Sequence, residues 1–336
     1  MKAVVLHKLG DISELDKNLP IEEVPVPEIS DDEVLVKVHY ASLNHRDVWI
    51  TKGLYSKIKL PIILGSDCSG TIEKLGGGVS HLSPGQEVII NPSINWGENE
   101  AYQSPSYEIL GLPQDGTLAE YVKIKAKYAY PKPAHLNFEQ ASALPLGGLT
   151  AYRAAILKAK IKPSDKVLIT GIGGGVATFA LLYSLAIGAD TYVTSGSDEK
   201  ITRAVSLGAN SGVNYKNDGW DDTLKEKNIT VVIDSSGGDT IAKALDFTAY
   251  GARIVTYGAT NGTVKDFSIH RVYWKQLQIL GSTMGSDRDF GEMLDFVNQN
   301  KIIPVVDEVF ALANSVSAFK RMNDGGQFGK IVIKIA

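Results

Sequence analysis

"DKVLITGIGGGVATFALLYSLAIGADTYVT", residues 165–194, reads in order as a short apolar strand, a glycine-rich loop, a helix-length apolar segment and a second strand. The same alternation continues downstream, where each short apolar run is separated from the next by a segment of helical length. Strands that alternate with helices predict a parallel, doubly wound sheet of the α/β class. Further strands are expected at 229–234, 252–258 and 277–284, and further helices at 195–210 and 239–251.

The glycine-rich loop, "GIGGGVA" at 171–177, predicts a dinucleotide site. Glycines let the backbone approach a pyrophosphate, and the helix that follows offers free N–H groups and the positive end of its dipole. The flanking strands and helix supply the context that this motif requires. The fit is imperfect because, with Gly174 and Ala177 at the second and third motif positions, Ile172 stands at the first. We expect cofactor contacts from Gly173, Gly174, Gly175 and Val176.

The end of the second strand discriminates between the two nicotinamide cofactors. Folds that bind NAD place an acid there, on the ribose 2′-hydroxyl, whereas this chain has "TSGS" at 194–197 before any acid appears. Small hydroxyls with a lysine nearby favour a 2′-phosphate. The expected cofactor is therefore NADP(H), held by Ser195, Ser197 and Lys200. In the alternative interpretation, Asp198 is the ribose acid and Lys200 is a solvated helix residue.

The first 127 residues show a different pattern of apolar residues and turn signals. Short runs such as "MKAVVL" (1–6) and "EVLVKVHY" (33–40) read as strands, the second with valines at every other position, and glycine and proline turn signals follow closely. This pattern predicts a barrel-like β domain. The stretch 91–115 lacks periodicity and is expected to form a long surface lobe.

The two sequence patterns suggest that the N-terminal and C-terminal parts of the chain form one domain and that the middle part forms the other. We expect the β domain over 1–127, the cofactor domain over 128–300 and a return to the β domain over 301–336. The last segment ends in alternating Ile331, Ile333 and Ile335, which predict a strand.

The amino-acid composition limits which classes of binding partner and which cellular compartment are to be expected. Lysine and arginine (34) against aspartate and glutamate (38) give a net charge of −4, which offers no electrostatic reason for a nucleic-acid or membrane partner. No apolar run reaches the roughly 18 residues of a membrane-spanning helix, and the first residues turn polar too early for a secretory signal. A lone cysteine, Cys68, forms no intrachain disulfide, so the expected location is the cytoplasm.

Several stretches, in this order and spacing, resemble the medium-chain dehydrogenase/reductase superfamily across essentially the whole chain. They are "PEISDDEVLVKVHYASLNHRDVW" (27–49), "LPIILGSDCSGTIEKLG" (60–76), "LSPGQEVI" (82–89), "DGTLAEYV" (115–122), "ASALPLGGLTAYRA" (141–154) and the glycine loop. The resemblance implies a GroES-like β-barrel domain joined to a Rossmann domain. It also implies a homodimer or homotetramer in which the last sheet strand, here "QILGSTM" (278–284), pairs between subunits.

The zinc ligands of the alcohol dehydrogenases in this superfamily are missing. The family's first cysteine ligand falls at Asn44, its Gly-His-Glu run at Gly65-Ser66-Asp67, and its third ligand near Leu146. The family's structural-zinc lobe needs four cysteines, and 91–115 contains none. No metal is therefore expected. Cys68 reads as a small buried hydrophobe, and Asp67 is expected to make a local hydrogen bond.

The better match is the zinc-free branch of quinone oxidoreductases and related enone reductases. In that branch the residue at Asn44 approaches the nicotinamide, and the aromatic residues after it, here Trp49 and Tyr55, line the substrate cleft. The resemblance further implies cofactor contacts from Thr150 in "GLTAY", Tyr215 in "VNYK" and Gly258 after the 252–258 strand.

The missing ligands bear on the reaction. Zinc lowers the pKa of a bound water or alcohol, to about 7 for water, whereas hydride delivery to a quinone or conjugated enone gives an anion that hydrogen-bond donors can stabilise. We therefore expect an NADPH-dependent reductase of quinones or α,β-unsaturated carbonyls. Asn44 would orient the nicotinamide amide or the oxyanion, and Tyr55 or water would supply the proton. Two alternatives remain: an alcohol or aldehyde dehydrogenase with a non-zinc base, and a non-catalytic NADPH-binding sensor or scaffold.

Two further side chains have structural interpretations. Asp47 is expected to pair with Arg46 or with a group in the cleft, and Trp274 is expected to have a packing role.

Overall fold

The computed structural model describes all 336 residues. The chain forms two compact units: a β unit made of Met1–Gly147 and Gly285–Ala336, and an α/β unit made of Gly148–Met284. Both predicted sheet types are present, which confirms the fold class. No helix is long and apolar enough to cross a membrane.

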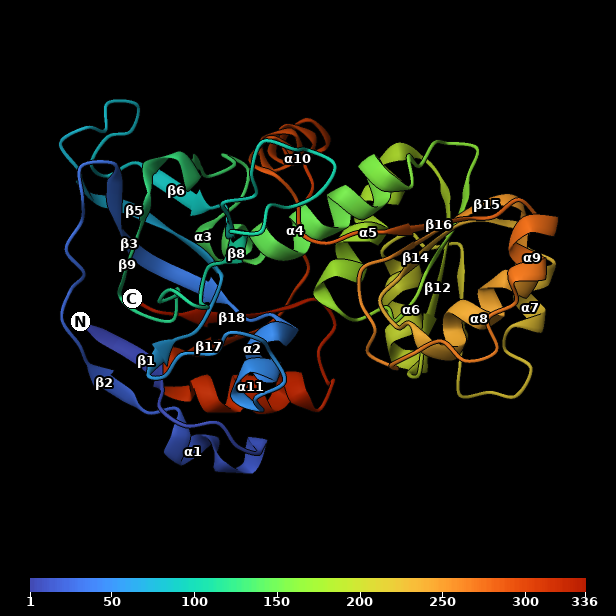
Figure 1. Cartoon of the computed structure of the whole chain (residues 1–336), viewed down its shortest axis with the longest axis horizontal. Helices are drawn as coiled ribbons and strands as arrows, with labels where there is room; N and C mark the ends of the chain where they lie inside the picture. Colours follow the sequence, from blue (N-terminus) through green and yellow to red (C-terminus); the bar gives the residue numbers. More distant parts are fainter. The chain divides into compact units, whose positions relative to one another are not determined.

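The β unit is built on a seven-stranded sheet (Figure 1) in the order β10-β6-β5-β3-β18-β17, with β9 also paired to β3. The long strand β3 (Glu33–Ser42) is the centre of the sheet and pairs antiparallel with β5, β9 and β18. Its Val34, Val36 and Val38 are buried, as the period-two pattern predicts, and each contributes about 1.5–3 kcal/mol by burial. The other strands are β1 (Lys2–Leu6), β2 (Ile21–Glu23), β4 (Ile62–Ile63), β5 (Asp67–Leu75), β6 (Glu87–Ile90), β9 (Tyr121–Lys125), β10 (Ala129–Pro131), β17 (Val306–Ala311) and β18 (Lys330–Lys334).

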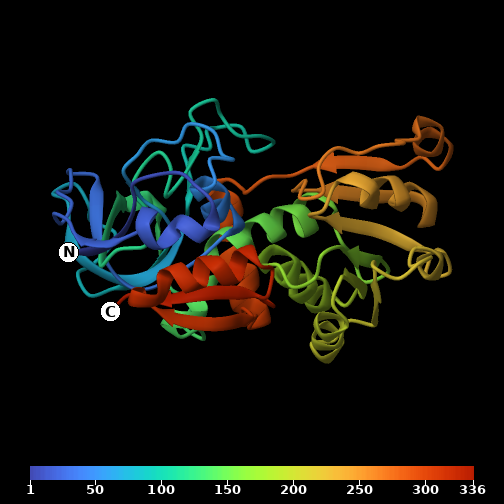
Figure 2. The ribbon, with the colours of Figure 1, turned by 90° about the horizontal axis from the view of Figure 1, so that it is seen from below.

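The C-terminal segment belongs to the β unit. β18, which carries alternating isoleucines, lies between β3 and β17, and Figure 2 shows this segment beside the N-terminal part of the chain. Helices of this unit are α1 (Leu15–Asn18), α2 (His45–Thr51), α3 (Phe138–Ala143), α10 (Asp287–Asn300) and α11 (Ser315–Asn323), with 3-10 turns at Ile12–Glu14, Ala126–Tyr128 and Leu312–Asn314, and α4 (Pro145–Tyr152) runs across the boundary.

The 91–115 lobe is more ordered than the sequence indicates. It contains a two-stranded ribbon of β7 (Ser93–Ile94) and β8 (Glu108–Ile109). Its Trp96, Leu110 and Leu112 are buried. The lobe therefore packs apolar residues of its own against the β unit instead of lying wholly on the surface.

The α/β unit has a parallel six-stranded sheet in the order β13-β12-β11-β14-β15-β16, with the helices α5 to α9 flanking it in Figure 1. This is the doubly wound order in which the chain starts at a central strand, runs to one edge and then crosses to the other. The strands are β11 (Lys166–Ile169), β12 (Asp190–Ser195), β13 (Ser211–Asn214), β14 (Ile229–Asp234), β15 (Thr248–Thr256) and β16 (Gln278–Gly281). The helices are a π-helical turn at Arg153–Lys158, α5 (Gly175–Ile187), α6 (Asp198–Ser206), α7 (Asp222–Lys225), α8 (Gly238–Phe247) and α9 (Ile269–Trp274).

Candidate active site and cofactor-binding residues

The strand order of the α/β sheet reverses between β11 and β14, which is where open α/β sheets bind ligands. Thr170, directly after β11, donates through Oγ1 to Oδ1 of Asp234 at 2.7 Å, and it accepts the Ser235 N–H at 3.1 Å. Burial raises the pKa of Asp234. This buried polar contact fixes the point from which the glycine-rich loop begins.

The glycine-rich loop presents backbone rather than side chains. Gly171 and Gly173 have φ angles of +65° and +120°, a region that glycine adopts at little cost. Gly174 is the N-cap of α5 and has no side chain to cap it, so the first amides of the helix are available to an anion. Gly174, Gly175 and Val176 are partly exposed, whereas Gly173 is buried. The loop has the geometry of a pyrophosphate cradle.

Ser195 and Ser197 lie together at the end of β12, as predicted. The Ser197 N–H donates to Oγ of Ser195 at 3.2 Å, and Oγ of Ser197 accepts the Lys200 N–H at the start of α6. The Tyr215 N–H donates to the Ser195 carbonyl at 3.0 Å. The structure therefore brings Ser195, Ser197 and Tyr215 together, with the backbone of Lys200 beside them.

A second lysine belongs to the same loop. A Cβ added to Gly196 would lie 2.8 Å from Oη of Tyr215 and 2.9 Å from Cε of Lys216, so both side chains fold over this glycine. Lys216 was not among the predicted cofactor residues, although it follows the predicted Tyr215 directly. Asp198, the alternative ribose acid, accepts a hydrogen bond from Nδ2 of Asn214 at 2.8 Å.

The remaining predicted cofactor residues of this unit differ in their placement. Gly258 follows β15, and a Cβ there would lie only 2.7 Å from the Ser235 carbonyl, so Gly258 joins the edge that carries the glycine-rich loop. Thr150 lies on α4, buried, with its Oγ1 3.5 Å from Sδ of Met284.

A buried polar network surrounds Asn44 in the β unit. The ammonium of Lys330, 2% exposed, donates to Oδ1 of Asn44 at 2.7 Å, to Oδ2 of Asp67 at 2.9 Å and to the Leu43 carbonyl at 2.9 Å. Nδ2 of Asn44 donates to Asp67 at 2.9 Å, and Oδ1 of Asp67 accepts the Leu146 N–H at 2.8 Å. Because an ammonium only donates, the orientation of the Asn44 amide is fixed. Nδ2 of Asn44 makes this one hydrogen bond within the protein, so its second amide hydrogen has no protein partner.

Asp67 is therefore not a local turn residue. The prediction of a local hydrogen bond was wrong, because the partners of its carboxylate come from Ser42, Asn44, Leu146 and Lys330, far away in the sequence. Its neighbour Cys68 is fully buried in the core of the β unit, and burial raises the pKa of its thiol. Cys68 is thus a buried apolar residue, as predicted.

Arg46, on the first turn of α2, is also buried, at 6% exposure. Its Nη1 donates to Oγ of Ser66 at 2.7 Å and to the Leu110 carbonyl at 2.9 Å. The guanidinium lies 5.2 Å from the ring centroid of Tyr55, a distance typical of cation–π contact. Its Nε is buried without a hydrogen-bond partner.

The other predicted side chains on and near α2 have different surroundings. Trp49 and Tyr55 are partly exposed, and the Trp49 ring contacts that of His45. The expected Arg46–Asp47 pair is absent: Oδ2 of Asp47 accepts the Asn44 N–H at 2.8 Å, and its Oδ1 is buried without a partner. Burial raises the pKa of Asp47.

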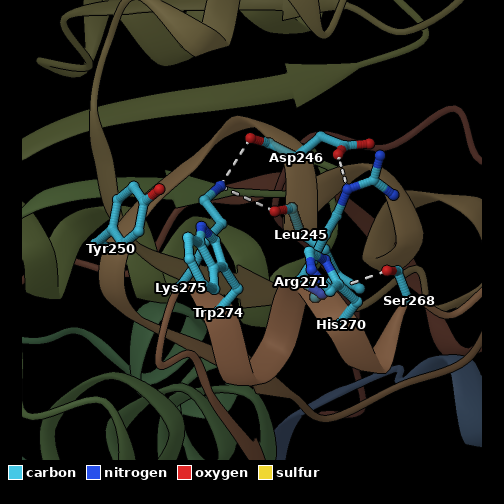
Figure 3. A pocket seen from close by; sticks show the side chains of 8 residues that line it. All are labelled: Leu245, Asp246, Tyr250, Ser268, His270, Arg271, Trp274 and Lys275. Carbon is cyan, nitrogen blue, oxygen red and sulfur yellow. Dashed lines mark hydrogen bonds and ion pairs between the residues drawn. The ribbon is translucent and has the colours of Figure 1, made fainter.

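A surface pocket of the α/β unit lies apart from the predicted site residues, where the end of α8 meets α9 (Figure 3). Nζ of Lys275 donates to the Leu245 and Asp246 carbonyls at 2.9 and 2.8 Å, so it caps the last turn of α8. Trp274 lines this pocket and is 62% exposed. The packing predicted for Trp274 is limited to the surface, where its ring stacks on that of His270 with 6.1 Å between centroids.

Two family models match the chain, one within the β unit and one that covers most of the α/β unit. Residues 30–134 match the alcohol dehydrogenase GroES-like domain, and residues 175–299 match the zinc-binding dehydrogenase domain. Together they span more than half of the sequence.

The relatives cover nearly the whole chain. A zinc-type alcohol dehydrogenase-like protein, YogA, of Leptosphaeria maculans is 35% identical over 94% of each protein. A crotonyl-CoA reductase of Streptomyces avermitilis is 27% identical over 98% of this chain and 87% of the relative. The crystal structure of an NAD-dependent alcohol dehydrogenase is 36% identical and superposes with a TM-score of 0.93 over 100% of both chains.

The name of the second family model implies zinc, but the side chains present do not fit it. Asn44, Ser66 and Leu146 stand at the ligand positions, and Asp67 is already engaged by the Lys330 ammonium. No group of three or more His, Cys, Asp or Glu side chains is placed to hold a metal ion. With both domains matched in order and relatives of 35–36% identity along its length, the chain belongs to the medium-chain dehydrogenase/reductase superfamily of oxidoreductases.

Proposed function

We propose that this protein is an NADP(H)-dependent reductase that transfers hydride to quinones or α,β-unsaturated carbonyls without a metal ion. The observation that carries the proposal is the Lys330–Asp67–Asn44 network. A divalent cation next to Asn44 would have to displace a buried ammonium that makes three hydrogen bonds. What the chain offers an incoming oxygen is hydrogen-bond donors, which suit an enolate or phenolate better than an alkoxide.

The proposed NADP(H) preference is supported by the loop after β12. Two serine hydroxyls, the Tyr215 hydroxyl and the side chain of Lys216 gather around Gly196, and Lys200 lies in the first turn of the adjoining helix. Hydroxyl donors and ammonium groups match a 2′-phosphate. The solved structure that is 36% identical is named as an NAD-dependent alcohol dehydrogenase, so the test of this preference measures both cofactors.

Names among the relatives support reduction of a conjugated acceptor. Besides the crotonyl-CoA reductase, an acryloyl-coenzyme A reductase of Sulfurisphaera tokodaii is 29% identical over 94% of this chain. Both names describe substrates in which a carbon–carbon double bond is conjugated to a carbonyl.

Each of these residues would have a separate role in the reduction. When bound, the reduced nicotinamide supplies a hydride to the β-carbon of the acceptor, and the electron pair of the double bond moves toward the carbonyl oxygen. The free amide hydrogen of Asn44 would orient the nicotinamide amide or hydrogen-bond the oxyanion. Tyr55 or water would then supply the proton, so that one hydride and one proton saturate the double bond.

The test compares two reactions. Oxidation of NADPH by quinones and by enones is measured beside reduction of NADP⁺ by simple alcohols, with the same enzyme and with NADH and NAD⁺ in parallel. We expect turnover with the conjugated acceptors. Activity with alcohols only would favour the dehydrogenase alternative, and tight NADPH binding with no turnover over a broad carbonyl panel would favour the sensor alternative.

Lys216→Ala is expected to raise the KM for NADPH about tenfold while leaving the KM for NADH unchanged. One lost charge-assisted contact to a 2′-phosphate accounts for about 1.5 kcal/mol. Lys225→Ala, which removes an exposed lysine of the same unit that pairs with Asp222, is the matched control. An equal change for both cofactors would show that Lys216 does not contact the 2′-phosphate.

We also propose that the chain forms a dimer through β16. This strand is an edge of the α/β sheet, with one side paired to β15 and the other open, and open edges readily pair with another chain. The exposed aromatic residues Tyr250, Tyr273 and Trp274 lie on the adjoining surface, partly lining the pocket of Figure 3.

Ile279→Lys, on the exposed part of β16, is expected to convert the dimer into a monomer. A charge there would have to be buried in the dimer, at a cost of several kcal/mol unless it is paired. Sedimentation velocity over a concentration series measures the change, with Lys334→Glu on β18 of the other unit as the control. A dimer that persists unchanged in the Ile279 variant would rule out this edge as the interface.

A further inference from the structure

Three acceptor oxygens of the β unit surround one point, and the ammonium of Lys330 occupies that point. The oxygens are the Leu43 carbonyl, Oδ1 of Asn44 and Oδ2 of Asp67, which lie 2.9, 2.7 and 2.9 Å from Nζ. An ammonium has three donor hydrogens and no lone pair, so each hydrogen has one acceptor. Lys330 and Asp67 are both buried. The three oxygens therefore form a buried cation site whose cation is carried by the chain itself.

The backbone around Lys330 sets the position of this cation. The Lys330 N–H donates to the Val305 carbonyl at 2.9 Å, just before β17. On the other side, the Leu43 N–H at the end of β3 donates to the Ile331 carbonyl at 3.0 Å. Gly329 has a φ of +109°, and a Cβ added there would lie 2.3 Å from the Val305 carbonyl oxygen. The start of β18 is thus held tightly from both sides, directly beside Asn44.

Asn44 is the most exposed member of this network. It is 8% exposed, against 2% for Lys330 and 0% for Asp67. Both charged neighbours impose the same orientation on its amide, because the ammonium donates to Oδ1 and the carboxylate accepts from Nδ2 at 2.9 Å. A turn of the amide by half a rotation would set two donors against each other on one side and two acceptors on the other. The second amide hydrogen of Asn44 therefore has a fixed direction.

Both constraints on the Asn44 amide depend on Lys330. Without the ammonium, Oδ1 of Asn44 loses its donor directly. Asp67 also becomes a lone buried carboxylate, and such a group is neutralised by taking up a proton. A protonated carboxyl group donates as well as accepts, so it no longer distinguishes Oδ1 of Asn44 from Nδ2. The amide is then free to turn, and its second hydrogen loses its fixed direction.

We infer that Lys330 is a positioning residue of the reductase, whose ammonium holds the Asn44 amide in the orientation that presents an N–H to the ligand. The inference rests on the proposed function, in which Asn44 hydrogen-bonds the oxyanion or the nicotinamide amide. The ammonium also withdraws electron density from the amide through Oδ1, and a polarised amide is a stronger donor. In this role Lys330 touches neither substrate nor cofactor and acts only through Asn44.

Asn44→Ala, Lys330→Met and the double variant test whether Lys330 acts through Asn44. We expect kcat for enone reduction to fall about tenfold in each single variant, the loss of one hydrogen bond to a charged group. The double variant should lose no more than either single variant, because the amide that Lys330 orients is already absent. The melting temperature should still fall when Lys330→Met is added to Asn44→Ala, since Asp67 loses its ammonium in both backgrounds.

The control for this cycle is Lys334→Met, which removes an exposed lysine of the same strand and should leave kcat unchanged. A merely structural role of Lys330 would lower the melting temperature without this dependence of kcat on Asn44. An unchanged kcat in Lys330→Met would overturn the inference. Losses that multiply to about a hundredfold in the double variant would overturn it as well, since independent effects add in free energy.

A small amine tests the cation site itself. Lys330→Ala removes three carbons and the ammonium, which n-propylammonium replaces, whereas n-propanol has the same carbon chain and no charge. We expect n-propylammonium, present while Lys330→Ala refolds from urea, to raise the melting temperature and to raise kcat at least about threefold. n-Propanol should do neither. Equal effects of the two compounds, or no effect of the amine, would show that the three oxygens do not form a cation site.

Failure of the inference and failure of the proposed function give different results. If the amine raises the melting temperature of Lys330→Ala but the parent protein reduces no acceptor, the cation site is supported and the reductase is defeated. If the parent reduces enones and Lys330→Met keeps its full kcat, the inference is defeated and the reductase stands. If Lys330→Met does not fold, the comparison of n-propylammonium with n-propanol on Lys330→Ala decides alone.

Discussion

Lys330→Met is expected to lower the free energy of unfolding of the β unit by about 3–5 kcal/mol, because removal of one partner of a buried ion pair leaves an uncompensated charge. The charge left behind is that of Asp67, which is fully buried. Methionine fills nearly the same volume as lysine, so the loss of stability comes from the unpaired charge and not from a cavity. The Leu43 carbonyl and Oδ1 of Asn44 lose their donor as well.

The measurement is a urea or thermal unfolding curve for the transition of the β unit. Lys334→Met, on the same strand but exposed, is the matched control and should change stability by no more than about 0.5 kcal/mol. The double variant Lys330→Met/Asp67→Asn should be more stable than Lys330→Met alone, since asparagine keeps an acceptor for the Leu146 N–H without the charge. A loss below about 1 kcal/mol in the single variant would mean that the ammonium does not anchor this network.

The sequence predicted those parts of the molecule that repeat a local pattern. Alternating valines placed β3 correctly, and the strand–glycine–helix context of 165–194 located β11, α5 and β12 because each element is marked by its own neighbours. β13 was not predicted, since "SGVN" has one apolar side chain and pairs only through its backbone to β12.

The candidate site was harder to predict because its partners are distant in the chain. Lys330 and Asp67 are 263 positions apart. The alternating isoleucines predict that β18 is a strand. They do not predict that Lys330, on the opposite face of this strand, contacts Asn44. Arg46 likewise reaches the Leu110 carbonyl, 64 positions away, only after the lobe has folded. The exposure of Trp274 could not be predicted either, because a large apolar residue on a short helix looks the same in sequence whether its face is covered or open.

Gly174→Ala is expected to weaken NADPH binding about a thousandfold, the largest effect on the cofactor of any single change considered. The backbone at Gly174 has φ −72° and ψ 151°, which alanine adopts without strain. The nearest atom to an added Cβ is the Gly171 carbonyl oxygen at 3.9 Å, so the protein itself has room for the methyl group. The methyl group would instead occupy the space through which a pyrophosphate reaches the first amides of α5. Loss of two charge-assisted hydrogen bonds there is worth about 4 kcal/mol, hence the factor of a thousand.

The control for this prediction is Gly291→Ala in α10, another glycine with nothing close to an added Cβ. That variant should gain up to about 1 kcal/mol of stability from helix propensity and keep its NADPH affinity. Fluorescence titration of NADPH and a melting curve, made on both variants, give the comparison. If Gly174→Ala binds NADPH within about threefold of the parent protein, the backbone of the loop does not approach the pyrophosphate, and the glycines serve only the turn. If instead the affinity for NADPH falls about a thousandfold while the melting temperature stays unchanged, the amides of the loop bind the cofactor. An unchanged melting temperature shows that the new methyl group clashes with no part of the protein, so the loss must come from a clash with the bound cofactor.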